Sequence, residues 1–225
     1  MSLRFIYGRS GSGKTRFCLE EMKSKIQGGA AHPLVLLVPE QFTHQAERDL
    51  IKLLGTGGVL GAHVLSFRRM AFRIFNEGGG ITYPHLHPAG KCMIIYRILD
   101  RMKDRLTVFG KSADCRGFVN TIADLITEFK RHNISPEDLD QEAGGLAEDN
   151  GLQLKLAELN FIYAAFEETI AARFRDGDDD LTLAADKLEA TSLFDGADIW
   201  IDGFVNFTPQ EYKMIAKLLA KARQV

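Results

Sequence analysis

Eight consecutive residues near the start of the chain have the types and spacing of a phosphate-binding loop. The segment Gly8-Arg9-Ser10-Gly11-Ser12-Gly13-Lys14-Thr15 matches G-x-x-x-x-G-K-[S/T] at every fixed position. Glycines let successive backbone N–H groups converge on an anion, and a following helix adds the positive end of its dipole. In this pattern Lys14 reaches the β- and γ-phosphates, and the Thr15 hydroxyl takes a position on Mg²⁺. We therefore expect all eight residues to bind ATP, with Mg²⁺ beside Thr15.

The segments on either side of the loop predict the strand and the helix that such a site needs. Residues 3–7 are mostly apolar and predict a short buried strand that enters the loop. Residues 15–27 carry apolar side chains at helical spacing and predict the helix that leaves it. A flexible Gly/Ser turn before a helix is the plainer alternative, but the order strand, loop, helix favours a phosphate site.

Two more strand–helix pairs follow along the chain. The continuous apolar run Leu34–Val38 and the shorter run Ala62–Leu65 predict strands buried within a parallel sheet. Helices are predicted after each strand, the second of them with Ser66 as its N-cap. Successive β–α units of this kind predict an α/β fold with a doubly wound parallel sheet, which with the loop is the fold of a P-loop NTPase.

The pattern then becomes helical. Residues 88–188 show amphipathic helical spacing and no convincing strand. A strand is predicted again at Asp198–Asp202, and the following Thr208-Pro209-Gln210-Glu211 has the form of a capping box that begins a helix. We therefore expect a sheet-containing subdomain of residues 1–87 and 189–225, interrupted by an all-helical subdomain of residues 88–188.

Asp202 is the candidate metal-binding acid that would act with Thr15. In P-loop proteins an acid at the end of a neighbouring buried strand helps hold Mg²⁺, although Asp202 could also simply cap a turn at Gly203. Motors that hydrolyse ATP usually have a glutamate next, to orient or deprotonate the attacking water. Gly203 has no side chain for either task, so we expect nucleotide binding without fast hydrolysis and assign no catalytic residue.

Polar, aromatic and basic side chains follow the second and third predicted strands. Because ligands bind at the carboxyl edge of open α/β sheets, these side chains are candidates for contact with single-stranded DNA through stacking and phosphate binding. For each of them a helix cap or a solvated charge is the alternative. The candidates are Gln41, Thr43, Ser66, Phe67, Arg68 and Arg69.

Composition sets outer limits on the function. The 225 residues carry a net charge of −2, which argues against a generally basic nucleic-acid coat but allows a local groove. The three cysteines are widely spaced and form neither a disulfide framework nor a zinc pattern, so we expect a reducing cytoplasm. No apolar run is long enough to span a membrane. We expect a surface loop at His85–His87 and a solvated, helix-initiating acidic turn at Asp176–Asp180, not metal sites.

Several stretches together resemble one protein family, the AddB-type subunits of the bacterial ATP-dependent helicase–nuclease AddAB, in their N-terminal part. The last stretch is the most specific, because it combines the strand acid, the missing glutamate and the capping box. The stretches are Gly8–Thr15, Leu37–Gln41, Leu65–Phe67, Thr127–Arg131 and Ile201–Glu211.

The resemblance implies a superfamily-1 helicase-like architecture. Residues 1–87 and 189–225 would be the RecA-like 1A subdomain, and residues 88–188 the inserted 1B-type subdomain. Motors of that superfamily carry Asp-Glu-x-Gln-Asp where this chain has Asp202–Asn206, so only the metal-binding acid is retained. The resemblance further implies an AddA-type motor partner, single- and double-stranded DNA as ligands, and a role in recombination and double-strand break repair. The family's nuclease and its iron–sulphur cluster are expected only in the C-terminal part of a longer chain.

Three alternatives remain open. A competent helicase motor is disfavoured by Gly203 and Val205. A phosphotransferase of the nucleoside-kinase kind would need an acceptor pocket and an arginine-rich lid, neither of which is clear in residues 88–188. A structural module with a vestigial loop would not bind nucleotide at all.

Overall fold

The computed structural model describes residues 2–79, 83–146, 151–171 and 173–225, and it shows an α/β fold with a small parallel sheet. The three strands are β1 (Leu34–Leu37), β2 (Ala62–Leu65) and β3 (Asp198–Ile201), in the order β2-β1-β3. The chain divides into two compact units, residues 1–80 with 180–225 and residues 81–179. The first, sheet-containing unit carries the glycine-rich loop, and the second is the helical unit.

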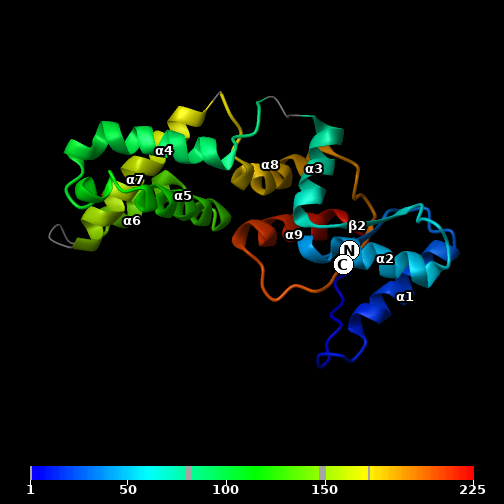
Figure 1. Cartoon of the computed structure of the whole chain (residues 1–225). Helices are drawn as coiled ribbons and strands as arrows, with labels where there is room; N and C mark the ends of the chain where they lie inside the picture. The colour runs from blue at the N-terminus through cyan, green and yellow to red at the C-terminus, as the bar shows by residue number, and fades with distance from the viewer. Residues whose placement is uncertain (1, 80–82, 147–150, 172) are drawn as a thin grey trace. The chain divides into compact units, whose positions relative to one another are not determined.

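The sheet-containing unit has helices on both faces of the sheet (Figure 1). One face is covered by α1 (Lys14–Gln27) and α2 (Thr43–Leu54). The other is covered by α3 (Phe67–Gly78), α8 (Asp180–Lys187) and α9 (Pro209–Lys221). The residues of α8 were expected in the helical block, but this helix packs against α3 and α9.

The central strand explains why the sheet needs cover on both sides. All four residues of β1 are buried, and they alternate between two cores. Leu34 and Leu36 contact the core under α1 and α2, whereas Val35 and Leu37 contact the core under α3, α8 and α9. The three strands predicted from apolar runs at 34–38, 62–65 and 198–202 are therefore confirmed to within one residue.

The predicted buried strand at residues 3–7 is wrong in this structure. Ser2 forms a parallel bridge with Gln224, and the Arg4 N–H donates to the Val225 carbonyl over 2.9 Å. Among the described residues the pairing of this segment goes no further, and Phe5 and Tyr7 are 77% and 92% exposed. Residues 223–225 lie between this segment and β3, and they pair with both.

The described part of the helical unit is built from four main helices around one apolar core. Its members include Ile95, Leu99, Ile126 and Phe166, all fully buried. The third of these helices has Ser135 as its N-cap, which forms a capping box with Asp138. The helices are α4 (Pro88–Met102), α5 (Arg116–Arg131), α6 (Pro136–Gly144) and α7 (Gly151–Ile170).

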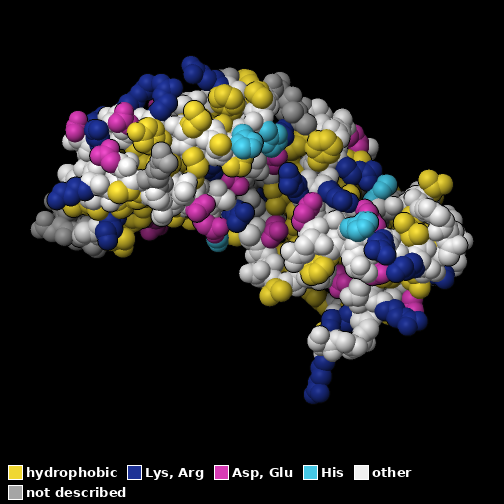
Figure 2. Space-filling model, viewed as in Figure 1, with side chains coloured by type: hydrophobic (Ala, Val, Ile, Leu, Met, Phe, Trp, Pro, Cys, Tyr) yellow, Lys and Arg dark blue, Asp and Glu magenta, His cyan; other side chains and the backbone are white. Residues whose placement is uncertain are grey.

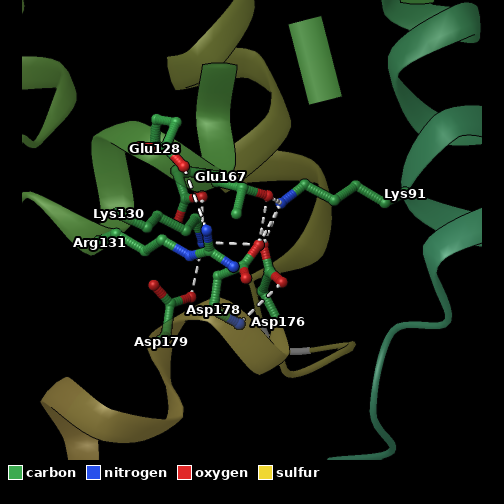
Figure 3. A network of polar contacts seen from close by, with 9 residues as sticks. Lys91, Glu128, Lys130, Arg131, Glu167, Asp176, Asp178 and Asp179 are labelled. Atoms are coloured by element: carbon green, nitrogen blue, oxygen red, sulfur yellow. Dashed lines mark hydrogen bonds and ion pairs between the residues drawn. The ribbon is translucent and has the colours of Figure 1, made fainter. Parts of the chain in front are cut away.

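The acidic turn that precedes α8 is not solvated, contrary to the expectation from sequence. Asp176 is 5% exposed and Lys130 is 4% exposed, and their charged groups lie 3.2 Å apart. Lys91 approaches Asp176 at 3.1 Å, and Asp179 lies 2.6 Å from the Lys130 Nζ (Figure 3). Burial raises the pKa of Asp179 to about 6 even though the Lys130 charge opposes that shift. The turn is charged because it pairs with buried lysines, not because it faces water.

Lys130→Ala tests how much the helical unit depends on these pairs. Removing the ammonium leaves Asp176, Asp179 and Glu167 without a shared buried cation, which we expect to cost about 3–5 kcal/mol of unfolding free energy. Urea unfolding followed by circular dichroism measures the change. The control is Lys103→Ala, whose ion pairs are largely exposed, so the expected change is much smaller than for Lys130→Ala. Equal effects of the two substitutions would contradict a buried role for Lys130.

Candidate nucleotide-binding site

The loop before α1 has the backbone that its glycines permit. Gly11 and Gly13 have φ values of 76° and 88°, in the left-handed region that favours glycine. A Cβ atom on Gly8 would lie 2.6 Å from the Ser12 Oγ, so the loop folds closely over its own start. In Figure 1 this loop extends away from the strands, and Figure 2 shows basic side chains at its tip.

Lys14 and the start of α1 converge on the loop. The Lys14 Nζ donates hydrogen bonds to the carbonyls of Gly8 and Arg9, over 2.9 and 3.0 Å. The N-cap of α1 is Gly13, which offers no side chain to the N–H groups of the first turn. Thr15 is exposed in that turn. The arrangement presents one ammonium, one hydroxyl and the open N–H groups of a helix start, which suit an anion.

Asp202 continues β3 toward the same side of the sheet as α1. Its N–H donates to the Leu37 carbonyl over 3.0 Å, so the ladder extends one residue beyond the strand. Side chains alternate along a strand, and Trp200, two residues earlier, lies in the core under α1. Within the described ranges no ion pair occupies Asp202, and its side chain is half-buried.

The negative charge of Asp202 acts on the pKa of the Cys18 thiol in α1. Burial raises the pKa of Cys18 to about 11, and the negative charges of Asp202 and then Glu21 add to the effect. Cys18 lies one turn into α1 from Lys14. Asp202 and the start of α1 therefore belong to one electrostatic environment.

The residue after Asp202 has a backbone made for glycine. Gly203 has a φ of 82°, and a Cβ atom there would lie 3.4 Å from the Pro39 Cδ and 3.9 Å from the Phe42 ring. A glutamate at this position would be strained by the left-handed backbone, although its Cβ would make only ordinary contacts with the turn that follows β1. The backbone geometry therefore agrees with the absence of a carboxylate at this position.

Three of the predicted DNA-contacting residues have partners within the fold. Thr43 is buried and donates its hydroxyl proton to the Glu40 carbonyl over 2.9 Å. Ser66 is the N-cap of α3 and also hydrogen bonds the Glu40 carboxylate. Phe67 is buried in the core. In this structure all three stabilise the carboxyl edge from within.

The other three predicted residues are more accessible. Gln41 and Arg68 are exposed, whereas the Arg69 guanidinium forms an ion pair with Glu47 over 2.8 Å. The six candidates thus lie at the same edge of the sheet but do not form one continuous polar surface.

An aromatic cluster at this edge was not predicted from the sequence. The ring of Phe204 lies 5.4 Å from that of Phe67 and 5.0 Å from that of Phe207, and the Phe207 ring lies 5.5 Å from that of Tyr212. Tyr212 is exposed, while Phe204 and Phe207 are half-buried. The available signal was the run of aromatic residues directly after Asp202.

The described residues offer neither a metal cluster nor a membrane span. No group of three or more His, Cys, Asp or Glu side chains is arranged to hold a metal ion in the ranges described. In those same ranges, none of the helices has the length and apolar character needed to cross a bilayer.

The comparisons with known proteins agree on one family. A family model described as "ADDB, N-terminal" matches residues 5–225. A protein of Acetivibrio thermocellus is 67% identical, one of Ruminiclostridium cellulolyticum 57% and one of Clostridium tetani 48%, each match covering 100% of this chain and 20% of the relative.

All three relatives are named as the B-type subunit of an ATP-dependent helicase/deoxyribonuclease, so the class is that of helicase–nuclease subunits. The chain belongs to the AddB family, in its N-terminal part. It spans about a fifth of the length of these curated relatives.

The proximity of Asp202 to α1 can be tested through Cys18. A pKa of about 11, against an ordinary 9.0, lowers the thiolate fraction at pH 8 about 100-fold, and burial slows access further. We expect iodoacetamide to label exposed Cys115 at least about 100-fold faster than Cys18, as measured by peptide mass spectrometry. Asp202→Asn should speed labelling of Cys18 alone.

The control is Asp195→Asn, which removes a carboxylate that pairs with Lys221. If Asp202→Asn and Asp195→Asn leave Cys18 equally slow, the Asp202 carboxylate does not lie beside α1.

Proposed function

We propose that this chain is the nucleotide-binding, RecA-like N-terminal part of an AddB-type subunit, with the fold of a P-loop NTPase of the superfamily-1 helicase type. The observation that supports it most directly is the loop at residues 8–15, which opens α1 with an uncapped helix start beside Lys14. Membership of the AddB family supplies the context of an ATP-dependent helicase and deoxyribonuclease.

The residues present fit Mg-ATP. Backbone N–H groups of the loop and the Lys14 ammonium would bind the phosphates, and the Thr15 hydroxyl with the Asp202 carboxylate would hold Mg²⁺. The fit rests on the uncapped first turn of α1 and on an Asp202 that has no ion pair among the described residues. A bound Mg²⁺ neutralises phosphate charge, and this chain's own groups orient the nucleotide.

Binding is proposed without efficient hydrolysis. The position after Asp202 has no side chain to activate water, and its left-handed backbone at φ 82° disfavours any replacement that would. The role of the nucleotide in this unit is then regulatory or structural, and the motor is a partner subunit of the AddA type.

We also propose that the carboxyl edge of the sheet contacts single-stranded DNA. The exposed rings of Tyr212, which packs on Phe207, and of Phe42, which lies beside Gly203, offer stacking faces that suit unpaired bases. Arg68 is an exposed cation at the same edge. Such a surface fits DNA repair and recombination in the cytoplasm, with double-stranded DNA as the substrate of the whole assembly. The nuclease, with any iron–sulphur cluster, is proposed to lie in the part of the family's chains beyond the matched fifth.

Lys14→Ala tests nucleotide binding. Loss of the ammonium that crosses the loop should weaken ATP binding at least about 100-fold in isothermal titration with Mg²⁺, because phosphate contacts to charged donors are strong. Lys52→Ala, which removes an exposed lysine from α2, is the matched control and should bind as the unaltered chain does. Equal affinity of the two variants would overturn the assignment of the loop.

The unaltered chain and the Lys14→Ala variant also serve to test ATP hydrolysis. We expect negligible ATP turnover with or without single-stranded DNA. Turnover that DNA strongly stimulates, and that Lys14→Ala abolishes, would instead favour a competent motor.

Phe42→Ala with Tyr212→Ala tests the DNA surface. Both rings are exposed, so the fold should persist, and the loss of two stacking faces should weaken single-stranded DNA binding about 10- to 100-fold in fluorescence anisotropy. Tyr96→Ala, which removes an exposed ring from the helical unit, is the control. An unchanged affinity in the double variant would remove the aromatic edge from the proposed DNA path.

A further inference from the structure

A series of polar contacts joins α1 to β3 on the face of the sheet that carries the loop. The indole N–H of Trp200 donates to the Glu21 carboxylate over 2.9 Å. One helical turn further along α1, the Lys25 Nζ donates to the Asp198 carboxylate over 2.7 Å. The Lys25 Nζ also lies 5.1 Å from the centre of the Trp200 ring, so the two contacts support each other.

The spacing of these contacts is in step along both elements. Four residues advance an α-helix by about 6 Å, and two residues advance a strand by about 6.6 Å. Lys25 on α1 therefore lies opposite Asp198 on β3, and Glu21 lies opposite Trp200. The helix and the strand run in opposite directions. One more step along β3 reaches Asp202, and the corresponding step along α1 reaches Phe17, in the first turn of the helix and two residues after Thr15.

Glu21 is the point where three elements meet. It belongs to α1, which leaves the loop, and it accepts from Trp200 on the strand that ends at Asp202. It also pairs with Arg4, in the segment that enters the loop, and the Arg4 guanidinium lies 5.5 Å from the Phe17 ring centre. One carboxylate thus links the entry to the loop, the exit from it and the strand of the acid.

Glu21 carries the negative charge that strengthens its hydrogen bond with Trp200. Burial raises the pKa of Glu21, but hydrogen bonds from Trp200 and Arg4 and the charges of Arg4 and Lys25 outweigh burial, so the pKa lies below its usual value. Glu21 is therefore ionised at neutral pH and is a strong acceptor for the indole N–H.

We propose that Trp200 is a positioning residue, whose hydrogen bond to Glu21 fixes the register of α1 along β3 and so aligns Thr15 with Asp202 for Mg²⁺. The inference rests on the proposed function, because it assigns a role in the same site. Trp200 does not touch the nucleotide; it acts through the helix that carries Thr15.

Trp200→Phe is the test variant, since it keeps an aromatic ring in the core and removes the N–H donor. We expect the Mg²⁺ concentration needed for half-maximal nucleotide binding to rise at least about tenfold, measured with a fluorescent ATP analogue. Affinity in EDTA, which reports the loop and Lys14 alone, should change less than about twofold. Glu21→Gln retains an acceptor for the indole and should give a smaller rise.

Tyr163→Phe is the matched control. It removes another buried aromatic donor, the hydroxyl that bonds the Ile134 carbonyl over 3.3 Å in the helical unit, and it should leave the Mg²⁺ requirement unchanged. An Mg²⁺ requirement that is the same in Trp200→Phe as in the unaltered chain would overturn the positioning role and leave nucleotide binding intact.

Hydrogen exchange of the nucleotide-free protein tests the positioning role of Trp200 separately from the proposed nucleotide binding. Without the Trp200 contact, we expect the amides of residues 18–22 to exchange at least about fivefold faster, with α2 unchanged. If the unaltered chain binds no nucleotide, the proposed function fails. Hydrogen exchange alone then tests whether the hydrogen bond from Trp200 to Glu21 fixes the position of α1 along β3. Faster exchange confined to α1 would then support it, and unchanged exchange would overturn it.

Discussion

The buried carboxylate of Asp198 is the interaction on which the sheet-containing unit depends. It is 1% exposed, and it accepts from Lys25 at the end of α1, from His32 before β1 and from Arg223 after α9. Burial alone would raise the pKa of Asp198, but these hydrogen bonds outweigh it and hold the pKa well below its usual range. A buried charge is costly without its partners, so this one residue ties three segments to the start of β3.

The consequence reaches the loop. Arg223 brings residues 223–225 beside β3, and those residues form the pairing edge for Ser2 and Arg4. The entry to the glycine-rich loop is thus held from the opposite end of the strand that carries Asp202. The loop is exposed, but the segment before it and the helix after it are both linked to Asp198. The segment before it pairs with residues 223–225, where Arg223 bonds Asp198, and the helix after it carries Lys25.

The parts of this structure that sequence predicted are those that local chemistry decides. Continuous apolar runs predicted β1, β2 and β3, because a strand buried on both faces needs apolar residues at every position. Thr208 with Glu211 predicted a helix start, because a capping box acts over only three residues. The loop at residues 8–15 was also predicted from a short pattern of consecutive residues, and its binding of phosphate stays a prediction.

The parts that sequence missed depend on distant partners. Residues 3–7 have the composition of a strand, yet pairing is decided by whichever segment lies alongside. Asp176 looked like a solvated acid, and its burial follows from Lys91, which is 85 residues away in the chain. Likewise Ser66 hydrogen bonds Glu40, which is 26 residues away in the chain, and Phe67 after β2 packs on Phe204 after β3. No short pattern reports such contacts.

The left-handed turn at Gly203 has an evolutionary consequence. With φ at 82°, a substitution that introduced a carboxylate would place a side chain on a left-handed backbone, which is strained for any residue but glycine. Placing a carboxylate there would therefore require the backbone of the turn after β3 to change as well. The side chain and the backbone would have to change together, so a single point mutation is a poor route to a carboxylate beside Asp202.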